Sequence, residues 1–335
     1  MARILLIQHM YHPEGEALLR AGSEMEVEVL SEDTLAALLP QLADAEAIIA
    51  RTPARVGADT ITAAPRLRVI STSGYGTDNI DIPAATAAGV VVVNNPGSAE
   101  NSVAEHAVAL VLGLAKKLTW SDAAVRAGRP WDFRRGFEAI ELKGRTLGVI
   151  GFGRIGREVA RKLHEGFGME VVAYDPLLDV ATLVPWARRA PSVEELLPQA
   201  DVVTIHCALT SETRRLFDER RLSLMRRGAL LINTARGPVV DEAALAAALR
   251  TGALGGAGID VYESEPPAAG NPLFELDSVI LTAHTAGLTV ESARQLALSA
   301  ATQVLAALDG VRPTNLVNPE VWERRRGAAG ALVER

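Results

Sequence analysis

Three ionisable side chains follow short apolar runs in the second half of the chain: Arg236, Glu265 and His284. The planar guanidinium of an arginine can hold a carboxylate through two parallel hydrogen bonds. The imidazole of a histidine can give or take a proton near neutral pH, and a carboxylate beside it orients the ring and favours its charged form. Together the three residue types predict a site that binds a small carboxylic acid and moves a proton on or off an oxygen atom.

Each of the three residues also has an ordinary interpretation. Arg236 precedes Gly237-Pro238 and could lie in a surface turn, whereas Glu265 precedes Pro266-Pro267 and could be a solvated loop acid. His284 could be a core histidine whose hydrogen bonds are satisfied. Because placement in a loop favours function only modestly, residue type and spacing alone leave both interpretations open.

A glycine-rich segment, Gly151-Phe152-Gly153-Arg154-Ile155-Gly156, follows the apolar run 146–150. Gly151 allows a tight turn between a strand and a helix, and Gly153 lets the backbone approach a pyrophosphate group. Gly156 lets the helix pack closely on its strand. Glycines at this spacing also mark ordinary strand-turn-helix units, but an apolar helical face and a second strand follow here, as a dinucleotide site requires.

The start of the predicted helix would hold the phosphates of the dinucleotide. The free backbone N–H groups of Arg154 and Ile155 would face them and favour their negative charge. The second strand, 169–174, leads to Asp175, nineteen residues after Gly156. A carboxylate there accepts hydrogen bonds from a ribose 2′-hydroxyl and repels a 2′-phosphate, so NAD is predicted in preference to NADP.

The predicted elements alternate between strands and helices, which indicates parallel sheets covered by helices on both faces. Because ligands bind beyond the carboxyl ends of such strands, we expect the three ionisable residues and the glycine-rich segment at one edge of one sheet. Besides 146–150 and 169–174, strands are predicted at 4–7, 27–30, 47–50, 67–72, 90–94, 201–207, 229–233, 256–261 and 279–282.

The other segments organise the chain around these strands. A long helix is predicted at 99–117, and because it is apolar almost all round it should be buried between domains or subunits. The segment 120–141 reads as a loop-rich connection. A last helix, 290–308, is expected to return to the first domain, and the charged, Gly/Ala-rich end at 324–335 is expected to fray.

The length, composition and charge of the chain indicate a globular protein and argue against some classes of partner. A length of 335 residues predicts about two domains, and 48% hydrophobic with 22% charged residues fits a globular chain with sizeable cores. The net charge of −7 argues against nucleic acid or an anionic membrane as a partner. The single cysteine, Cys207, excludes an intrachain disulfide. No transmembrane segment or signal peptide is apparent and no metal site is predicted, so we expect a cytoplasmic protein.

The chain resembles the D-isomer-specific 2-hydroxyacid dehydrogenase family over about residues 45–317. The resemblance implies two doubly wound parallel-sheet α/β domains: a flavodoxin-like substrate-binding domain (1–98 and 289–335) and a Rossmann NAD-binding domain (99–288). It rests on six segments in family order: Ser73-Gly74-Tyr75-Gly76-Thr77-Asp78-Asn79-Ile80-Asp81, Asn101-Ser102-Val103-Ala104-Glu105-His106, the glycine-rich segment with Tyr174-Asp175-Pro176, Ile232-Asn233-Thr234-Ala235-Arg236-Gly237, Ile259-Asp260-Val261-Tyr262-Glu263-Ser264-Glu265-Pro266, and His284-Thr285-Ala286-Gly287.

The resemblance also implies roles for residues at matching positions. Arg236 would bind the carboxylate and carbonyl of the substrate, His284 would be the acid/base, and Glu265 would pair with it. The loop Ser73-Gly74-Tyr75-Gly76 would give backbone N–H groups to the carboxylate. The residues expected at the cofactor are Gly151, Gly153, Arg154, Ile155, Gly156, Asp175, Thr234, Ala235 and Asp260, the last of them holding the nicotinamide carboxamide.

The implied function is hydride transfer between NAD(H) and a small 2-hydroxy or 2-keto acid, in a homodimer. Within the family the chain looks most like phosphoglycerate dehydrogenase-like members, and we expect no regulatory domain. Arg51 and Arg134 stand where such enzymes can carry cations for a substrate phosphate, but both could equally be solvated surface residues. The substrate therefore stays open among 3-phosphoglycerate, glycerate and glyoxylate.

Two other functions are compatible with the same residues. A corepressor-like protein of similar sequence would bind NAD(H) as a sensor and recruit protein partners without catalysis. A formate- or phosphite-type dehydrogenase of the same superfamily would keep the cofactor and oxidise a different substrate. Turnover of a 2-keto acid, of formate or of phosphite separates the three functions.

Overall fold

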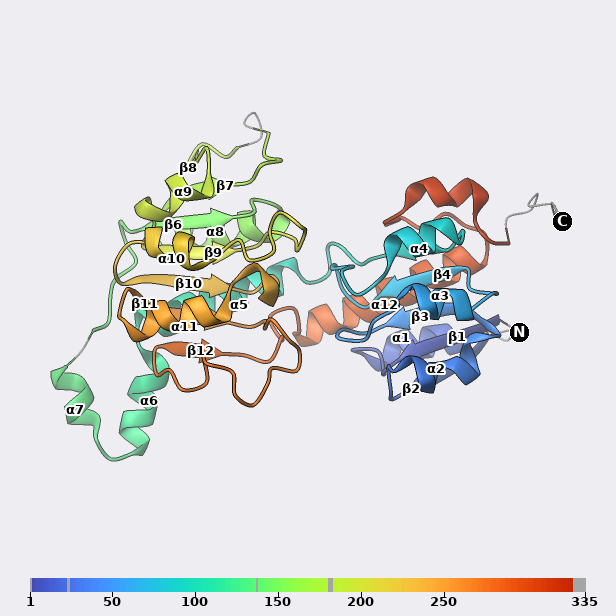
Figure 1. The fold of residues 1–335 in the computed structure, drawn as a ribbon, viewed down its shortest axis with the longest axis horizontal. Coiled ribbons are helices and arrows are strands. Elements are labelled where there is room, and N and C mark those ends of the chain that lie inside the picture. The colour runs from blue at the N-terminus through green and yellow to red at the C-terminus, as the bar shows by residue number, and fades with distance from the viewer. Residues whose placement is uncertain (1, 23–24, 137, 180–182, 328–335) are drawn as a thin grey trace. The chain divides into compact units, whose positions relative to one another are not determined.

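The computed structural model describes residues 2–22, 25–136, 138–179 and 183–327. By its internal contacts the chain divides into two compact units. Unit 1 comprises Met1–Ala99 with Leu288–Arg335, and unit 2 comprises Glu100–Gly287. Each unit is built around one parallel sheet with helices on both faces (Figure 1).

Unit 1 alternates strands and helices and takes its last helices from the end of the chain. Its elements are β1 (Ala2–Ile7), α1 (Pro13–Arg20), β2 (Met25–Leu30), α2 (Leu35–Leu42), β3 (Ala45–Ala50), α3 (Ala58–Ala63), β4 (Val69–Thr72), α4 (Ile82–Ala87), β5 (Val91–Val93), α12 (Val290–Leu308) and the 3-10 helix η4 (Pro319–Arg324).

The sheet of unit 1 has the strand order β2-β1-β3-β4-β5, which is the order of flavodoxin-like folds. Alternate residues of each strand face opposite sides, so Leu5 packs with α2, α3 and α4, and Ile4 packs with α1 and α12. Both faces are therefore buried, as a parallel sheet requires. The strand order reverses between β1 and β3, where a ligand site is expected beyond the carboxyl ends.

Unit 2 contains the long central helix and the second sheet. Its elements are α5 (Glu100–Ala115), α6 (Leu118–Arg126), α7 (Pro130–Arg135), β6 (Thr146–Ile150), α8 (Arg154–Phe167), β7 (Glu170–Tyr174), β8 (Ala187–Arg189), α9 (Val193–Leu196), η2 (Leu197–Gln199), β9 (Val202–Ile205), α10 (Glu219–Leu224), β10 (Ala229–Asn233), η3 (Gly237–Val239), α11 (Glu242–Arg250), β11 (Leu254–Ile259) and β12 (Val279–Leu281).

The seven strands of unit 2 are parallel and lie in the order β12-β11-β10-β9-β6-β7-β8. One face packs against α9, α10 and α11, and the other packs against α5 and α8. The order reverses between β6 and β9, so the glycine-rich turn that leaves β6 lies at the expected ligand position. The predicted fold class, two doubly wound parallel sheets, is confirmed.

Most predicted elements are present, but the structure also contains a strand and two helices that the sequence patterns did not predict. Every predicted strand exists with ends shifted by at most two residues, whereas β8 was not predicted. The interpretation of 120–141 as loop-rich is wrong in part, because α6 and α7 occupy much of it. Since α6 has no buried residue, it lacks the apolar period that reveals a helix.

Two further expectations concern the long helix and the end of the chain. Much of the apolar surface of α5 packs in the core of unit 2. This packing accounts for the apolar composition of the helix without a contact to another domain or subunit. The expected fraying at 324–335 is wrong for the described part, because Nη1 of Arg326 donates to the carbonyl of Ala64 at 2.9 Å. Residues 328–335 lie outside the described residues. Among the described residues, no helix has the length and apolar composition that a membrane crossing needs.

Candidate active site

Three neighbouring strands of unit 2 end close to the residues that could do chemistry. Arg236 follows β10, Glu265 follows β11 and His284 follows β12, and these strands lie side by side in the sheet. Because all the strands are parallel, their carboxyl ends meet at one edge. The turns after the strands therefore bring the three side chains to the same edge of unit 2.

His284 is held by Glu265. Nδ1 of the imidazole lies 2.6 Å from Oε2 of the carboxylate, and Oε1 accepts a hydrogen bond from the backbone N–H of Tyr262 at 3.1 Å. Since Nδ1–H is donated to Glu265, Nε2 is the nitrogen left to meet a ligand. In the described part of the chain, Nε2 has no hydrogen-bond partner. This geometry is that of an oriented acid/base histidine.

The Glu265 carboxyl is half-buried, and burial by itself would raise its pKa. The hydrogen bond and the positive charge of His284 act in the opposite direction, together with the Tyr262 N–H and the charge of Arg236. They outweigh burial, so the pKa of Glu265 lies below its ordinary value and the residue is a carboxylate at neutral pH. The influence of Arg236 also indicates that its guanidinium lies near this pair.

The turn after β12 is held by hydrogen bonds to Asp260, a fully buried carboxylate that follows β11. Oδ1 accepts the backbone N–H of Thr285 and Oδ2 accepts that of Ala286, each at 2.9 Å. His284, just before them, has a φ of 54°, a left-handed conformation that is uncommon for a residue with a side chain. Asp260 thus stabilises a strained turn, and its expected contact with the nicotinamide carboxamide stays a prediction.

Arg236 is positioned by the asparagine that ends β10. The side chain of Asn233 donates to the backbone carbonyl of Arg236 and accepts the N–H of Ala235, each at 3.0 Å. Nη1 of Arg236 donates to the carbonyl of Ala235 at 2.8 Å. Within the described residues, the buried hydroxyl of Thr234 in the same turn has no hydrogen-bond partner. Such an orphaned hydroxyl fits the predicted cofactor contact at Thr234 and Ala235.

The glycine-rich turn between β6 and α8 has the shape that a dinucleotide site requires. Gly151 has a φ of 88°, and a β-carbon there would lie 2.6 Å from the backbone nitrogen of Cys207. A β-carbon on Gly156 would lie 2.1 Å from the carbonyl oxygen of Gly151. A β-carbon on Gly153 would meet nothing within 4 Å, so this part of the turn has room for a phosphate.

Arg154 and Ile155 begin α8 directly after this open turn. The first backbone N–H groups of any α-helix lack partners within the helix, and they attract anions. The Arg154 side chain is exposed, and its Nη1 lies 3.7 Å from a carboxylate oxygen of Glu100. The backbone at this position therefore fits the pyrophosphate of NAD.

Asp175 follows β7 and binds the glycine-rich turn directly. Oδ2 accepts the N–H of Phe152 at 2.9 Å, and Oδ1 accepts that of Leu177 at 2.9 Å. Each carboxylate oxygen can accept a second hydrogen bond, so ribose hydroxyls can bind the same group. A 2′-phosphate at this position would meet a negative charge.

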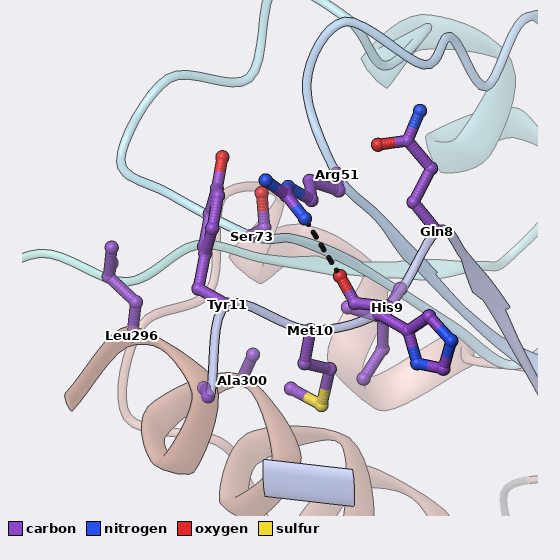
Figure 2. Close-up of a pocket in the computed structure, with 10 residues that line it drawn as sticks. Gln8, His9, Met10, Tyr11, Arg51, Ser73, Leu296 and Ala300 are labelled. Atoms are coloured by element: carbon purple, nitrogen blue, oxygen red, sulfur yellow. Dashed lines mark hydrogen bonds between the residues drawn. The ribbon is translucent and has the colours of Figure 1, made fainter. Parts of the chain in front are cut away.

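Unit 1 has a pocket where its strand order reverses, beyond the ends of β1, β3 and β4 (Figure 2). The guanidinium of Arg51 lies 4.3 Å from the centroid of the Tyr11 ring and donates to the carbonyl of His9 at 3.3 Å. Among the described residues it has no carboxylate partner. The hydroxyl of Ser73, in the wall of the same pocket, is buried and has no hydrogen-bond partner in the described part of the chain. These groups together favour an anionic ligand.

The loop Ser73-Gly74-Tyr75-Gly76 follows β4 at the edge of this pocket. The N–H of Ser73 donates to the carbonyl of Ala50 at 3.0 Å, and the side chain of Asn94 donates to the carbonyl of Tyr75 at 2.8 Å. The Tyr75 side chain is 61% exposed. Within the described chain the N–H groups of Tyr75 and Gly76 have no partner, so both are available to a carboxylate.

Arg134 lies apart from the sheet edge of unit 2. It is exposed on α7, and its guanidinium lies 5.2 Å from the centroid of the Trp131 ring on the same helix. The helices α6 and α7 project away from the sheet (Figure 1). The proposed phosphate role of Arg134 therefore rests on the resemblance alone.

Several residues around these sites were not given a role from the sequence. Tyr11 follows β1, and the rule that ligands bind beyond strand ends would have found it. Tyr262 and Thr282 act through a contact between turns, in which the Tyr262 hydroxyl donates to the Thr282 carbonyl at 2.8 Å. No sequence pattern indicates such a contact. In the part of the chain that the structure describes, no group of three or more His, Cys, Asp or Glu residues could hold a metal.

Comparison with known proteins gives consistent matches. The family model described as "D-isomer specific 2-hydroxyacid dehydrogenase, NAD binding domain" matches residues 108–286. D-3-phosphoglycerate dehydrogenase of Archaeoglobus fulgidus is 40% identical over 294 residues, which cover 88% of this chain and 55% of that protein. Glyoxylate reductase of Thermofilum pendens is 40% identical over 295 residues, which cover 86% of each.

Solved structures agree with the sequence matches. The crystal structure of the TT0316 protein from Thermus thermophilus has a TM-score of 0.84 at 35% identity, and the match covers 94% of this chain and 99% of that one. In length, the chain spans just over half of the Archaeoglobus relative and most of the Thermofilum relative.

Proposed function

The chain belongs to the D-isomer specific 2-hydroxyacid dehydrogenase family, and we propose that it transfers a hydride between NAD(H) and a small 2-hydroxy or 2-keto acid. The observation that carries the proposal is the 2.6 Å contact between His284 and Glu265, on the sheet that also bears the glycine-rich turn. An oriented acid/base histidine and a dinucleotide turn are the two parts that a coupled transfer of a proton and a hydride needs.

Three residues of unit 2 would have separate roles in the reduction of a keto acid. Arg236 would bind the substrate carboxylate through paired charge-assisted hydrogen bonds. His284 would donate the proton on Nε2 to the carbonyl oxygen as that oxygen becomes a hydroxyl. Glu265 would balance the positive charge on His284 before the transfer and keep the ring in place. When bound, NADH supplies the hydride that reduces C2.

We assign cofactor binding to unit 2, which also carries Arg236, and the remaining substrate contacts to unit 1. The range of the NAD-binding family model, 108–286, lies within unit 2 and supports the first assignment. The start of α8, Asp175 and the Thr234-Ala235 turn would hold the dinucleotide, and the carboxylate of Asp175 favours NAD over NADP. In unit 1, the free N–H groups after Ser73 would bind the substrate carboxylate.

For the substrate, we propose an acid with a second anionic group, of which 3-phosphoglycerate is the example with a named relative. The support is the pocket of unit 1, where Arg51 has no carboxylate partner among the described residues and the Ser73 hydroxyl is unsatisfied. Glyoxylate or another small unphosphorylated acid is the alternative, because a glyoxylate reductase is equally similar to this chain.

The test of the function is consumption of NADH with purified protein. The panel contains glyoxylate, hydroxypyruvate, phosphohydroxypyruvate and pyruvate, with NADPH in parallel. We expect turnover of at least one keto acid with NADH and a preference for the phosphorylated acid. Tight binding of NADH without turnover of any acid, formate or phosphite would instead support the NAD(H)-sensing function.

We further propose that the chain forms a homodimer through α6 and α7. These helices carry exposed apolar side chains, Leu118, Val125 and Trp131, which are 56%, 59% and 62% exposed. Exposed apolar groups that gather on one part of a surface are typical of interaction sites. Light scattering of the native chain and of the Val125→Glu/Trp131→Glu variant tests this. A monomeric native chain would contradict the proposal.

For the location, we propose the cytoplasm. The single cysteine, Cys207, is a free thiol in the structure, which suits a reducing compartment. An NAD-linked reduction also needs a supply of the cofactor. Fractionation of the source cells, followed by detection with an antibody, would place the protein, and recovery from a secreted fraction would count against this location.

A further inference from the structure

His106 lies on α5, and its ring reaches the turn that carries His284. Nε2 of His106 lies 3.0 Å from Oγ1 of Thr282 and 3.7 Å from Oδ1 of Asp260. Oγ1 of Thr282 lies in turn 2.5 Å from the same Oδ1. Three residues from three elements therefore form a chain of contacts that ends at the carboxylate holding the His284 turn.

The direction of these hydrogen bonds follows from the number of protons available. The Thr282 hydroxyl has one hydrogen, and a carboxylate can only accept, so the hydroxyl donates to Asp260. Its oxygen must then accept from His106, which places a proton on Nε2 of His106. Each hydrogen bond of the chain thus pairs one donor with one acceptor, and the buried carboxylate of Asp260 accepts from the Thr282 hydroxyl and from the N–H groups of Thr285 and Ala286.

A second hydrogen bond from the same helix holds the other end of the turn. Ser102 is four residues before His106, so both lie on one face of α5. The buried hydroxyl of Ser102 donates to the carbonyl of Ala286 at 2.9 Å. The helix therefore holds the turn at Thr282 through His106 and at Ala286 through Ser102, with His284 between the two points.

We propose that His106 and Thr282 are positioning residues, which keep His284 in its left-handed conformation through the carboxylate of Asp260. The inference rests on the proposed acid/base role of His284. A residue with a positive φ relaxes when its surroundings no longer hold it. A displacement of about 1 Å in a reacting group can lower a rate by about 100-fold, so a looser turn costs turnover even with every catalytic group present.

The test uses four single variants and one double variant of the full chain. His106→Phe removes the donor and keeps a ring, Thr282→Val removes the hydroxyl, and His106→Gln restores an N–H donor. The matched control is His164→Phe, because His164 is a histidine of the same unit whose Nδ1 bonds the carbonyl of Met169 at 2.8 Å, far along the chain from the turn.

We expect His106→Phe and Thr282→Val each to lower kcat for keto-acid reduction by about 10- to 100-fold, with the KM for NADH within about threefold of the native value. His106→Gln should recover most of the rate. The double variant His106→Phe/Thr282→Val should lose no more than Thr282→Val alone, because His106 acts through that hydroxyl. His164→Phe should keep the native kcat.

A second measurement does not depend on activity. Hydrogen exchange at the Thr285 and Ala286 amides should become about tenfold faster in His106→Phe and stay unchanged in His164→Phe. Unchanged exchange at these amides in His106→Phe, or equal losses of kcat in the two histidine variants, would overturn the inference. If the native protein reduces no keto acid, the proposed function fails, while the exchange result still decides the role of His106.

Discussion

Nδ1 of His284 and Oε2 of Glu265 lie 2.6 Å apart, although nineteen residues separate them in the chain. The contact forms because β11 and β12 are parallel neighbours whose carboxyl ends meet at one edge of the sheet. Glu265 reaches it from the turn after β11, and the backbone N–H of Tyr262 fixes its other oxygen. The contact between His284 and Glu265 is therefore a product of strand pairing, and the role proposed for each residue can be tested separately.

Replacing His284 by alanine should abolish proton transfer and spare the cofactor site. We expect His284→Ala to lower kcat by about 10²- to 10⁴-fold, the range of a general acid/base contribution. The dissociation constant of NADH, measured by fluorescence, should stay close to native, since the glycine-rich turn and Asp175 are untouched. A variant that loses NADH binding but keeps its turnover would refute the assignment.

Glu265 should make the stability of the protein depend on pH at the acid end. Its pKa is lower in the folded chain than its ordinary value of 4.5, so the carboxylate stabilises the fold above that pH. This contribution is lost as the pH falls through the lowered pKa. The stability difference between the native chain and Glu265→Gln, from urea unfolding, should be constant from neutral pH to about pH 5 and shrink below that. A difference that grows on acidification would contradict the lowered pKa.

The choice between NAD and NADP should depend on Asp175. Asp175→Asn removes the charge that repels a 2′-phosphate, and it also weakens the bonds to the N–H groups of Phe152 and Leu177. We expect kcat/KM to fall for NADH and the ratio of NADPH to NADH efficiency to rise by about tenfold or more, which corresponds to at least ~1.4 kcal/mol. An unchanged ratio in steady-state kinetics would show that another residue selects the cofactor.

Arg51 should matter only to a substrate with a second anionic group. A hydrogen bond to a charged group contributes about 1.5–3 kcal/mol, so Arg51→Gln should raise the KM for phosphohydroxypyruvate by about 10- to 100-fold. The KM for glyoxylate should stay within about twofold of native. Arg134→Gln is the matched comparison, because Arg134 is exposed on α7 and contacts the Trp131 ring on its own helix. Equal effects of Arg51→Gln on both acids would remove Arg51 from the phosphate site.

His206 should make the fold sensitive to mild acid. Burial lowers the pKa of His206 to about 3, from an ordinary value of 6.5. Although the residue keeps some exposed surface, Nδ1 is fully covered and has no partner among the residues that the structure describes, and Nε2 lies 2.8 Å from the Thr204 hydroxyl. The unfolded chain therefore binds a proton at a higher pH than the folded chain does.

The sign of this effect follows from proton linkage. The folded state is at its full stability above pH 6.5 and loses about 1.4 kcal/mol by about pH 5.5 through His206 alone. In His206→Gln that loss should be absent, so the native chain and the variant should converge in urea midpoint as the pH falls from about 7.5 to 5.5. Parallel curves for the two proteins would mean that His206 is protonated in the folded state as readily as in the unfolded chain.

Local sequence patterns predict which segments are strands, which glycines form the turn between β6 and α8, and which side chains follow strand ends. These features are local: an apolar run, a glycine spacing and a residue's place after a strand can all be read from neighbours in the chain. The helix α6 was not predicted because it has no buried residue and so no apolar period that would reveal it.

The contacts between these groups depend on tertiary packing. The resemblance implied that Glu265 pairs with His284, but it did not indicate that Asp260 accepts the Thr285 and Ala286 amides or that His106 of α5 contacts Thr282. Such contacts depend on strand register, on helix packing and on a left-handed φ at His284. No residue type or spacing encodes them, because each is set by the free energy of the whole packed unit, in which a local strain is tolerated when buried hydrogen bonds elsewhere outweigh it.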